Sequence, residues 1–259
     1  MQYDEIIAAF VTNLEKELGV VLKKEENSLL LTLSAIEPLF SLHIYYPNTP
    51  VIRLEDQTYK TFHIDIDQVL SDSKKIISRL VVLLGKGRSV YARKTVVARI
   101  DKKVALEFQT DHHLQSALAG KYRYGLFFNG ELVSIAIFSG GRHMRDKSAK
   151  YRSFELLRFC HKSGLRVVGG LSKLIQAFIK DFSPNDIMTY VDRDWTHLSN
   201  LHTIGFSERG QTSPQRFWAV KGNRYHITDE MALAELKRTF PNGYLIHNSG
   251  SNKLVLQLP

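Results

Sequence analysis

Apolar residues recur at helical spacing near the start of the chain and again before residue 88. The first run predicts an amphipathic helix that ends at Gly19, and the second predicts a helix over residues 69–84. Short apolar runs between them predict strands at residues 20–22, 29–33, 42–45 and 51–54. This order of helix, strands and helix predicts a small α+β domain.

A polar, glycine-containing segment at residues 86–89 predicts the boundary between two domains, residues 1–88 and 89–259. In the second domain, apolar runs flank the dipeptide Asn129-Gly130 on both sides. Asn-Gly suits the positive φ angles of a type I′ turn, so this segment predicts a β-hairpin. Further patterns predict a helix at 106–118, a strand at 216–220, a helix at 229–239, and a closing hairpin of residues 244–247 and 254–256.

Residues 153–206 carry the pattern with the clearest chemical meaning. A strand at 154–160 is followed by a glycine turn at 166–173, which opens an amphipathic helix, and then by a strand at 187–192. A glycine turn at the start of a helix exposes backbone N–H groups at the positive end of the helix dipole. The segment therefore predicts a binding site for a phosphate or pyrophosphate.

Composition limits the class of protein. The chain has 259 residues, of which 44% are hydrophobic, and no apolar run reaches the ~18 residues that a membrane helix needs. Asp4 and Glu5 stand where a secretory signal would be basic, so we expect a cytoplasmic protein that does not enter a membrane. The single cysteine, Cys160, excludes an internal disulfide and a cysteine-based zinc site, and its place in a strand predicts a buried thiol.

Charge is distributed unevenly along the chain. Residues 1–88 hold 10 Lys and Arg against 12 Asp and Glu, a net charge of −2, whereas residues 89–259 hold 25 against 14, a net charge of +11. A basic second domain suits an anionic partner such as DNA, RNA, CoA phosphates or an acidic protein. The basic residues are scattered, which also suits an ordinary solvated surface.

Three smaller groups of residues allow more than one interpretation. The loop 139–152 is basic and either contacts substrate phosphates or is simply solvated. Asp111, His112 and His113 lack a third metal ligand at a useful spacing, so we expect no metal site there. Carboxylates and a lysine near the strand at 51–54 fit either a degenerate nuclease-like magnesium site or a solvated loop; they are Glu55, Asp56, Lys60, Asp65 and Asp67.

The glycine turn and the residues that follow it resemble the acyl-CoA-dependent N-acyltransferase (GNAT) superfamily. Arg166-x-x-Gly169 matches the first half of the pyrophosphate loop of that family, and Gly205-Phe206 matches its closing element, whereas Leu171 stands where the family has Gly or Ala. The resemblance implies a mixed, mostly antiparallel sheet flanked by helices, and acyl-CoA as cofactor, with acetyl-CoA as the default. It implies these cofactor-binding residues: Arg166, Val167, Val168, Gly169, Gly170, Ser172 and Lys173.

Residues 90–259 more specifically resemble phage and mobile-element proteins with a GNAT-like domain that is often attached to homing-endonuclease modules. They are also distantly similar to the phage Mom DNA-modification protein. The matching segments include Tyr91-Ala92-Arg93-Lys94, Glu155-Leu156-Leu157-Arg158-Phe159, Val168-Gly169-Gly170-Leu171-Ser172-Lys173-Leu174 and Tyr190-Val191-Asp192-Arg193-Asp194-Trp195. This resemblance implies a link to nucleic acid.

The GNAT resemblance also implies roles in acyl transfer. It places Glu155 as the general base, Tyr190 and Asp192 across the gap between two strands, and Ser199 near the leaving thiol. Two alternatives stay open, because Glu155 also suits an ion pair with an arginine and Asp192 suits a helix N-terminus. Residues expected to contact nucleic acid or substrate are Arg142, His143, Arg145, Arg158, Arg193, Trp195 and Arg216.

The sequence thus predicts a GNAT-like group transferase that uses acyl-CoA or a related donor and acts on nucleic acid or its components. The alternative is a nucleic-acid-binding module of mobile-element origin that has lost acyl-CoA chemistry, and Leu171 favours this alternative. A third possibility is a protein that serves only in interactions.

Overall fold

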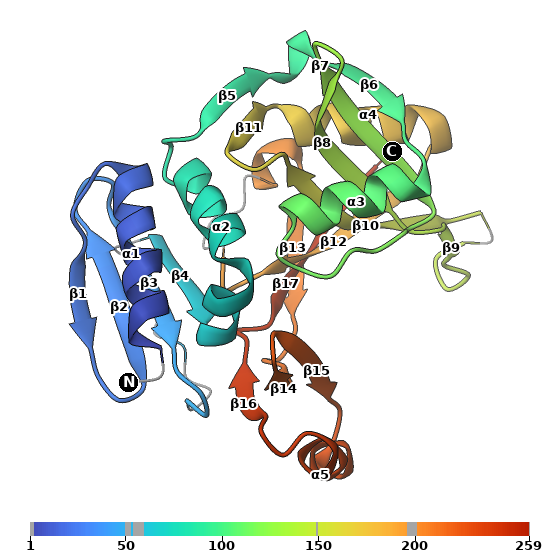
Figure 1. Ribbon diagram of the computed structural model, residues 1–259. Coiled ribbons are helices and arrows are strands. Elements are labelled where there is room, and N and C mark those ends of the chain that lie inside the picture. The colour runs from blue at the N-terminus through green and yellow to red at the C-terminus, as the bar shows by residue number, and fades with distance from the viewer. Residues whose placement is uncertain (1–2, 50–52, 54–59, 149, 196–200, 259) are drawn as a thin grey trace. The chain divides into compact units, whose positions relative to one another are not determined.

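The computed structural model describes residues 3–49, 53, 60–148, 150–195 and 201–258 (Figure 1). The chain forms two compact units, and each is built from separated segments. Unit 1 comprises Met1–Ile77, Val191–Ser199 and Gln211–Asn252, and unit 2 comprises Ser78–Tyr190, Asn200–Gly210 and Lys253–Pro259. None of the helices that the structure describes is long and apolar enough to span a membrane.

Unit 1 begins with a helix and a four-stranded sheet, and the helix that follows, α2, continues past Ile77 into unit 2. The sheet has the order β1-β2-β3-β4, with β3 and β4 parallel and the other pairs antiparallel. The elements are α1 (Asp4–Leu18), β1 (Lys23–Glu26), β2 (Leu30–Ala35), β3 (Phe40–Tyr45), β4 (Lys60–Asp65) and α2 (Ile66–Leu83). The predicted helix that ends at Gly19 is confirmed, because Gly19 has φ 69° and its N–H bonds the carbonyl of Glu15.

The strands of this sheet differ from the prediction at both ends. The strand predicted at 20–22 is wrong, because these residues are not in a strand and β1 comprises Lys23–Glu26. Residues 51, 52 and 54 of the strand predicted at 51–54 lie outside the described residues, and Arg53 is not in a strand. The strand β4 was not predicted, because polar Thr61, His63 and Asp65 interrupt its apolar residues. All three are buried, so β4 lacks the exposed polar face whose alternation with apolar residues identifies a strand in the sequence.

The last segment of unit 1 forms a second, smaller layer. Its sheet has the antiparallel order β15-β14-β16, and a helix packs on it through Trp218, Ile227 and Leu233. The elements are β14 (Arg216–Val220), β15 (Asn223–Ile227), α5 (Glu230–Thr239) and β16 (Tyr244–His247). The strand predicted at 216–220 and the helix predicted at 229–239 are confirmed. The closing hairpin is wrong, because β16 pairs with β14 while the C-terminal strand joins another sheet.

Most of unit 2 is one mixed sheet with the order β13-β17-β12-β10-β8-β7-β6. The pairs from β6 to β10 are antiparallel, and β10 is parallel to β12. The strands are β6 (Val96–Arg99), β7 (Tyr122–Phe128), β8 (Glu131–Phe138), β10 (Arg152–His161), β12 (Asp186–Asp192), β13 (Ser207–Gln211) and β17 (Ser251–Gln257). The predicted class, α+β with a mixed and mostly antiparallel sheet flanked by helices, is confirmed.

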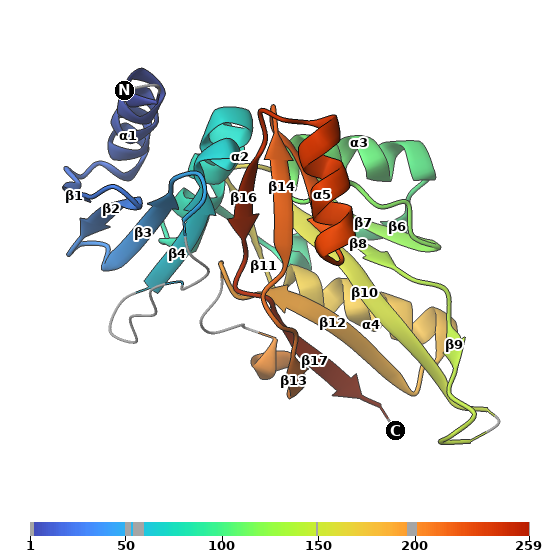
Figure 2. The same ribbon diagram turned by 90° about the horizontal axis from the view of Figure 1, so that it is seen from below.

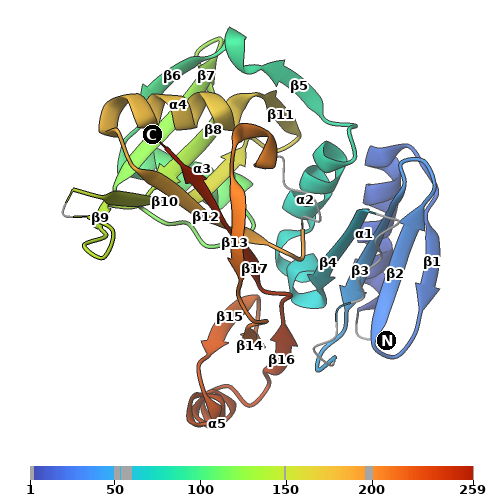
Figure 3. The ribbon, with the colours of Figure 1, turned by 180° about the vertical axis from the view of Figure 1, so that it is seen from behind.

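Two helices cover opposite faces of this sheet (Figures 1 and 3). On one face, α3 (Lys102–His112) packs Ala105 and Phe108 against Ile135, Ile137 and Cys160. On the other, α4 (Gly170–Phe182) stacks Phe178 on Phe138, with ring centroids 3.9 Å apart. The predicted hairpin between β7 and β8 is confirmed, with φ 50° at Asn129 and 82° at Gly130.

The division into units differs from the predicted boundary at residue 88. Residues 211–252 lie within the stretch of sequence predicted as the second domain, yet their contacts are with the N-terminal part of the chain. Arg224 makes ion pairs with Asp65 and Asp67, and the carbonyl of Leu245 accepts the N–H of Asn48. These contacts join residues about 150 to 200 positions apart, which a reading of local composition does not reveal.

Candidate functional site

The first feature of the candidate site is the short pairing between β10 and β12. The ladder joins only Ser153–Glu155 to Asp186–Met188. One residue further on, the hydroxyl of Thr189 donates to the carbonyl of Leu156 over 2.9 Å. The remaining halves of the two strands are not joined by this ladder, and we refer to these unpaired carboxyl ends as the opening between β10 and β12. The carboxyl ends of adjacent parallel strands are a common place for a ligand.

The second feature is a β-bulge at the middle of β10. Leu156 lies opposite Phe138 and Arg158 lies opposite Ile137, so Leu157 is an extra residue in the ladder. A bulge turns backbone groups away from the regular ladder and redirects the side chains that follow. An N–H group freed in this way is suited to polarise a carbonyl oxygen in a reaction.

The third feature is the glycine turn before α4. It follows a short strand, β11 (Leu165–Val168), and Gly169 is the residue before the helix, with φ 76°. A Cβ at Gly170 would lie 3.1 Å from Val167 and 3.3 Å from the ring of His161, so only glycine fits there without a shift of its neighbours. The first backbone N–H groups of α4 have no partner within the helix and suit an anion.

The side chains of the predicted cofactor-binding segment have different environments. Arg166 is exposed, Val168 is 37% exposed and Ser172 is half-buried, whereas Val167 is buried. The ammonium of Lys173 donates to the carbonyls of Ala92, over 2.9 Å, and of Thr95. Lys173 therefore ties two segments of unit 2 together in this structure instead of pointing at the glycine turn.

His161 is a functional candidate that the sequence analysis missed. The hydroxyl of Ser134 donates to the carbonyl of Cys160, so it accepts from Nδ1 of His161, 3.0 Å away. Nε2 then carries the lone pair. Burial and the charge of Arg166 lower the pKa of His161 to about 4, so the ring is neutral at pH 7. The sequence signal that could have identified His161 is its position at the end of a strand just before the glycine turn.

Glu155 lies next to the bulge, on the face of the sheet that α3 covers. Its N–H donates to the hydroxyl of Ser139 and its carbonyl accepts the N–H of Ser139, both over 2.9 Å. In the described part of the chain, no ion pair joins its carboxylate to an arginine. The nearby Arg158 instead donates to the carbonyls of Leu157 and Ser116, and burial lowers its pKa. Arg158 thus secures the loop after α3.

The other predicted catalytic residues are placed in different parts of the molecule. Tyr190 is 44% exposed at the end of β12 in unit 2. Asp192 belongs to unit 1, where its carboxylate accepts the N–H of Asp194 over 2.9 Å. Asp192 thus bonds the turn at residues 193–195, and the alternative of a helix N-terminus falls on residues 196–200, which lie outside the described residues. Ser199 lies outside the described residues.

The residues predicted to contact nucleic acid fall into two groups. Arg142 and His143 form β9 (Arg142–His143), which pairs with β10, and both are exposed, as is Arg145 (Figure 2). Besides Arg158, which bonds the carbonyls of Leu157 and Ser116, the other three lie in unit 1. Trp195 is 4% exposed and packs on Phe62.

Arg193 and Arg216 complete this second group. The guanidinium of Arg193 donates to the carbonyl of Ser249 over 3.0 Å, and that of Arg216 pairs with Glu230 over 2.7 Å. The buried ring of Trp195 is not available for stacking on a base in this structure, and the two arginines already have protein partners. We therefore restrict the candidate nucleic-acid surface to the hairpin of β9 and β10.

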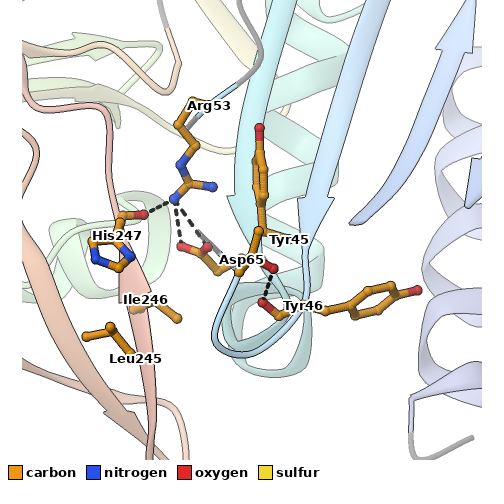
Figure 4. A pocket seen from close by; sticks show the side chains of 8 residues that line it. Tyr45, Tyr46, Arg53, Asp65, Leu245, Ile246 and His247 are labelled. Atoms are coloured by element: carbon orange, nitrogen blue, oxygen red, sulfur yellow. Dashed lines mark hydrogen bonds and ion pairs between the residues drawn. The ribbon is translucent and has the colours of Figure 1, made fainter. Parts of the chain in front are cut away.

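Unit 1 contains a separate network of buried charges beside a small pocket (Figure 4). Arg53 lies 3.2 Å from Asp65 and stacks over the ring of Tyr45 at 4.1 Å. Arg224 pairs with Asp65 over 3.1 Å and with Asp67 over 2.7 Å. The network thus joins residues of the N-terminal segment to a residue of the last segment of unit 1.

The pocket beside the network also faces His247. A second bond of Arg53 goes to the carbonyl of His247. Nη1 of Arg53 and Nδ1 of His247 are buried without a partner among the described residues. The pocket has room for about one water molecule, which suits a water that bonds both groups.

Asp194 completes this network. Its carboxylate accepts the N–H of Ser249 over 3.1 Å and the hydroxyl of Ser249 over 2.5 Å, and it lies 3.8 Å from Arg53. Burial raises the pKa of Asp194 to about 7 in spite of the opposing charge of Arg53. Burial raises the pKa of Asp65 as well. In both Asp65 and Asp194, burial favours the protonated form, whereas the charge of Arg53 favours the carboxylate.

The proposed nuclease-like site receives no support from the part of it that the structure describes. Glu55 and Asp56 lie outside the described residues, and Asp65 and Asp67 are paired with arginines. Among the described residues there is no group of three His, Cys, Asp or Glu side chains that could hold a metal ion. Carboxylates that are paired with arginine are poor ligands for Mg²⁺.

Comparison with solved structures finds GNAT acetyltransferases. A GNAT family acetyltransferase from Elizabethkingia anophelis with acetyl-CoA bound is 11% identical and has a TM-score of 0.38, with 64% of this chain and 99% of that chain covered. Arabidopsis thaliana Naa50, in complex with a bisubstrate analogue, is 10% identical and has a TM-score of 0.43, with the same coverage.

A third similar structure is the ribosomal-protein-S18-alanine N-acetyltransferase from Escherichia coli. It is 12% identical with a TM-score of 0.41, and 63% of this chain and 93% of that chain are covered. No protein-family model matches the sequence, and no curated protein matches it significantly. We carry no residue role over from these structures, and the site rests on the geometry of this chain.

Proposed function

We propose that this protein is an acyl-CoA-dependent group transferase whose donor occupies the opening between β10 and β12. The observation that carries the proposal is the combination of three features in unit 2: the short ladder, the bulge at Leu157, and the glycine turn at the start of α4. The pyrophosphate would lie at the N–H groups of α4, beside the exposed Arg166. The acyl carbonyl would lie at the bulge.

The residues around this opening provide the groups that acyl transfer requires. Bound acyl-CoA supplies an activated thioester. The backbone N–H at the bulge polarises the thioester carbonyl, and the Glu155 carboxylate takes the proton from the attacking amine. A C–N bond forms, the C–S bond breaks, and the Tyr190 hydroxyl gives its proton to the leaving thiolate.

We further propose that the acceptor is nucleic acid or one of its components. Arg142, Arg145 and Lys150 are exposed on the β9–β10 hairpin, beyond the end of β10 where the ladder with β12 begins. Residues 89–259 carry a net charge of +11, which favours an anionic acceptor. The resemblance to phage proteins and to the Mom DNA-modification protein points in the same direction.

A nucleic-acid-binding module without acyl-CoA chemistry is the second candidate. Two observations favour it: Leu171 departs from the small residue of the GNAT loop, and the Lys173 ammonium is already bonded to two carbonyls. Leu171 adds bulk where the family has a small residue, and the two bonds of Lys173 make its ammonium less available to a pyrophosphate.

Calorimetric titration with acetyl-CoA separates the two candidates. We expect micromolar binding by the unaltered protein, and a loss of about tenfold or more with Arg166→Glu, because this variant places a negative charge beside the pyrophosphate. Lys180→Glu is the matched control, since Lys180 is exposed in the last turn of the same helix. The absence of binding at millimolar acetyl-CoA, in a folded protein that binds DNA, would establish the second candidate.

A further inference from the structure

An exposed face of a two-stranded sheet adjoins the glycine turn. In this sheet β5 (Arg88–Tyr91) is parallel to β11, with Tyr91 opposite Val168 and Ser89 opposite Arg166. All four of these residues are exposed, whereas Val90, Leu165 and Val167 between them are buried, so the four side chains share the outward face of the two strands. Figure 3 shows β5 and β11 beside the start of α4. Tyr91 is 49% exposed and Val168 is 37% exposed. About half of the Tyr91 side chain is therefore not packed against other residues of the protein.

One cationic side chain contacts this exposed ring, and two more are on nearby residues. The guanidinium of Arg93 lies 4.9 Å from the centroid of the Tyr91 ring. Arg93 and Lys94 are both exposed in the short helical turn η1 (Ala92–Lys94), and Arg166 is exposed on the neighbouring strand. An aromatic ring with arginines beside it is the combination by which proteins hold a nucleobase together with its phosphates.

Two contacts fix this face beside the N-terminus of α4. The Lys173 ammonium, in the first turn of α4, bonds the carbonyls of Ala92 and Thr95 at the two ends of η1. A Cβ at Gly169 would lie only 3.6 Å from the Cβ of Ala92. Because Val168 directly precedes Gly169, a ligand with phosphates at the start of α4 can continue onto Val168 and Tyr91 without leaving the surface.

We propose that Tyr91, Arg93 and Arg166 form a subsite for the nucleotide end of the donor. The purine base stacks on Tyr91 and Val168, and the phosphate on the ribose pairs with Arg93 and Lys94. This inference rests on the proposed function and adds a choice of donor. The protein takes its acyl group from a donor that carries a nucleotide, and it discriminates against the same acyl-phosphopantetheine arm attached to a carrier protein.

The test compares two donors that differ only in the nucleotide. Acetyl-CoA and S-acetyl-phosphopantetheine, which lacks the nucleotide, are titrated into the full-length protein and into Tyr91→Ala and Arg93→Ala. We expect each variant to bind acetyl-CoA about tenfold more weakly and to bind the truncated donor as the unaltered protein does. Tyr91→Phe keeps the ring and should bind acetyl-CoA normally, and Lys180→Ala is the control for loss of a surface cation.

The outcomes separate this inference from the proposed function. If Tyr91→Ala and Arg93→Ala bind acetyl-CoA as tightly as the unaltered protein, the nucleotide subsite is overturned while the transferase proposal stands. If the unaltered protein binds neither donor, the transferase proposal fails, and adenosine 3′,5′-bisphosphate is then titrated alone. Binding that Tyr91→Ala removes would support a nucleotide subsite of another purpose, and no binding would overturn it. Thermal unfolding of each variant confirms that it is folded.

Discussion

The molecule holds two groups of polar residues that are built in opposite ways. In unit 1, Arg53, Asp65, Asp67 and Arg224 are mostly buried and satisfy one another through ion pairs. In unit 2, the glycine turn presents backbone N–H groups and an exposed Arg166 to the surface. Apart from Nη1 of Arg53, the first arrangement pairs its charged groups within the protein and holds segments of the chain together, whereas the second leaves its groups available to an external anion. Satisfaction of the polar groups, more than the number of charges, indicates which region binds a ligand.

The largest expected effect comes from removing the general base of the open site. Glu155→Gln should lower kcat by about 10²- to 10⁴-fold, because the amide cannot take the proton of the amine. Release of free thiol from acetyl-CoA in the presence of an accepted amine measures this rate. The affinity for acetyl-CoA and the thermal stability should not change.

Glu107→Gln is the matched control for Glu155→Gln, since Glu107 lies exposed on α3 and takes part only in a weak ion pair with Lys103. This variant should keep normal activity. If Glu155→Gln also keeps normal turnover, Glu155 is not the base.

The next largest expected effect comes from disrupting the network of buried charges in unit 1. Arg224→Leu leaves Asp65 and Asp67 without a partner that both share, and should lower the free energy of unfolding by about 3 kcal/mol. Urea denaturation measures this loss. Arg216→Leu is the comparison, because its ion pair with Glu230 is exposed and should contribute about 0–1 kcal/mol. Equal losses in the two variants would show that the network contributes no more than a surface pair.

The pH dependence of stability sharpens the same comparison. The pKa of Asp194 is about 7 in the folded protein and near 3.8 when the group is not buried. The folded state therefore binds the proton more tightly, and this group loses stabilising free energy as the pH rises from about 4 to about 7, by on the order of 1 kcal/mol per pH unit.

Asp194→Asn tests this dependence, because the amide oxygen can still accept from Ser249 but does not titrate. Between pH 4 and 7 the stability of the variant should fall less, or rise more, than that of the unaltered protein. Unfolding curves at several pH values provide the comparison. Parallel pH profiles of the two proteins would contradict the assignment.

The smallest expected effect concerns the basic hairpin. Replacing both Arg142 and Arg145 by alanine should reduce the slope of log K for DNA binding against log salt by about 2, since each arginine releases about one counterion. Arg209→Ala, on the exposed strand β13, is the control. An unchanged slope would place the nucleic-acid contact elsewhere on the protein.

The sequence predicted the elements whose patterns are local. The hairpin at Asn129-Gly130 and the helices α1 and α2 follow from turn chemistry and amphipathic spacing, and the glycine turn marked the start of α4 correctly. The strand β4 was not predicted, because its polar residues are buried by contacts with residues that are distant in the sequence. The ion pairs of Arg224 could not be predicted for the same reason, since Arg224 is 157 residues from Asp67 and 159 residues from Asp65.

The candidate site was predicted in part. Glu155, Arg166 and the two glycines lie in unit 2 as expected, but the roles of Lys173 and Trp195 changed once their partners were known. No sequence pattern marks the bulge at Leu157, because the apolar residues of the strand run on without interruption. It depends on the register between β8 and β10, which only pairing establishes.

The interleaving of the two units has a consequence for synthesis on the ribosome. Asp65 and Asp67 emerge early, but Arg224 and His247 are added only after nearly all of unit 2 has been made. During that interval Asp67 lacks its counter-ion and Asp65 has only Arg53, so the end of β4 is not yet stabilised by the last segment of unit 1 while the later sheet assembles. We expect that a nascent chain stopped at residue 210 is cut by protease within its first 77 residues, and that one extended past residue 252 resists.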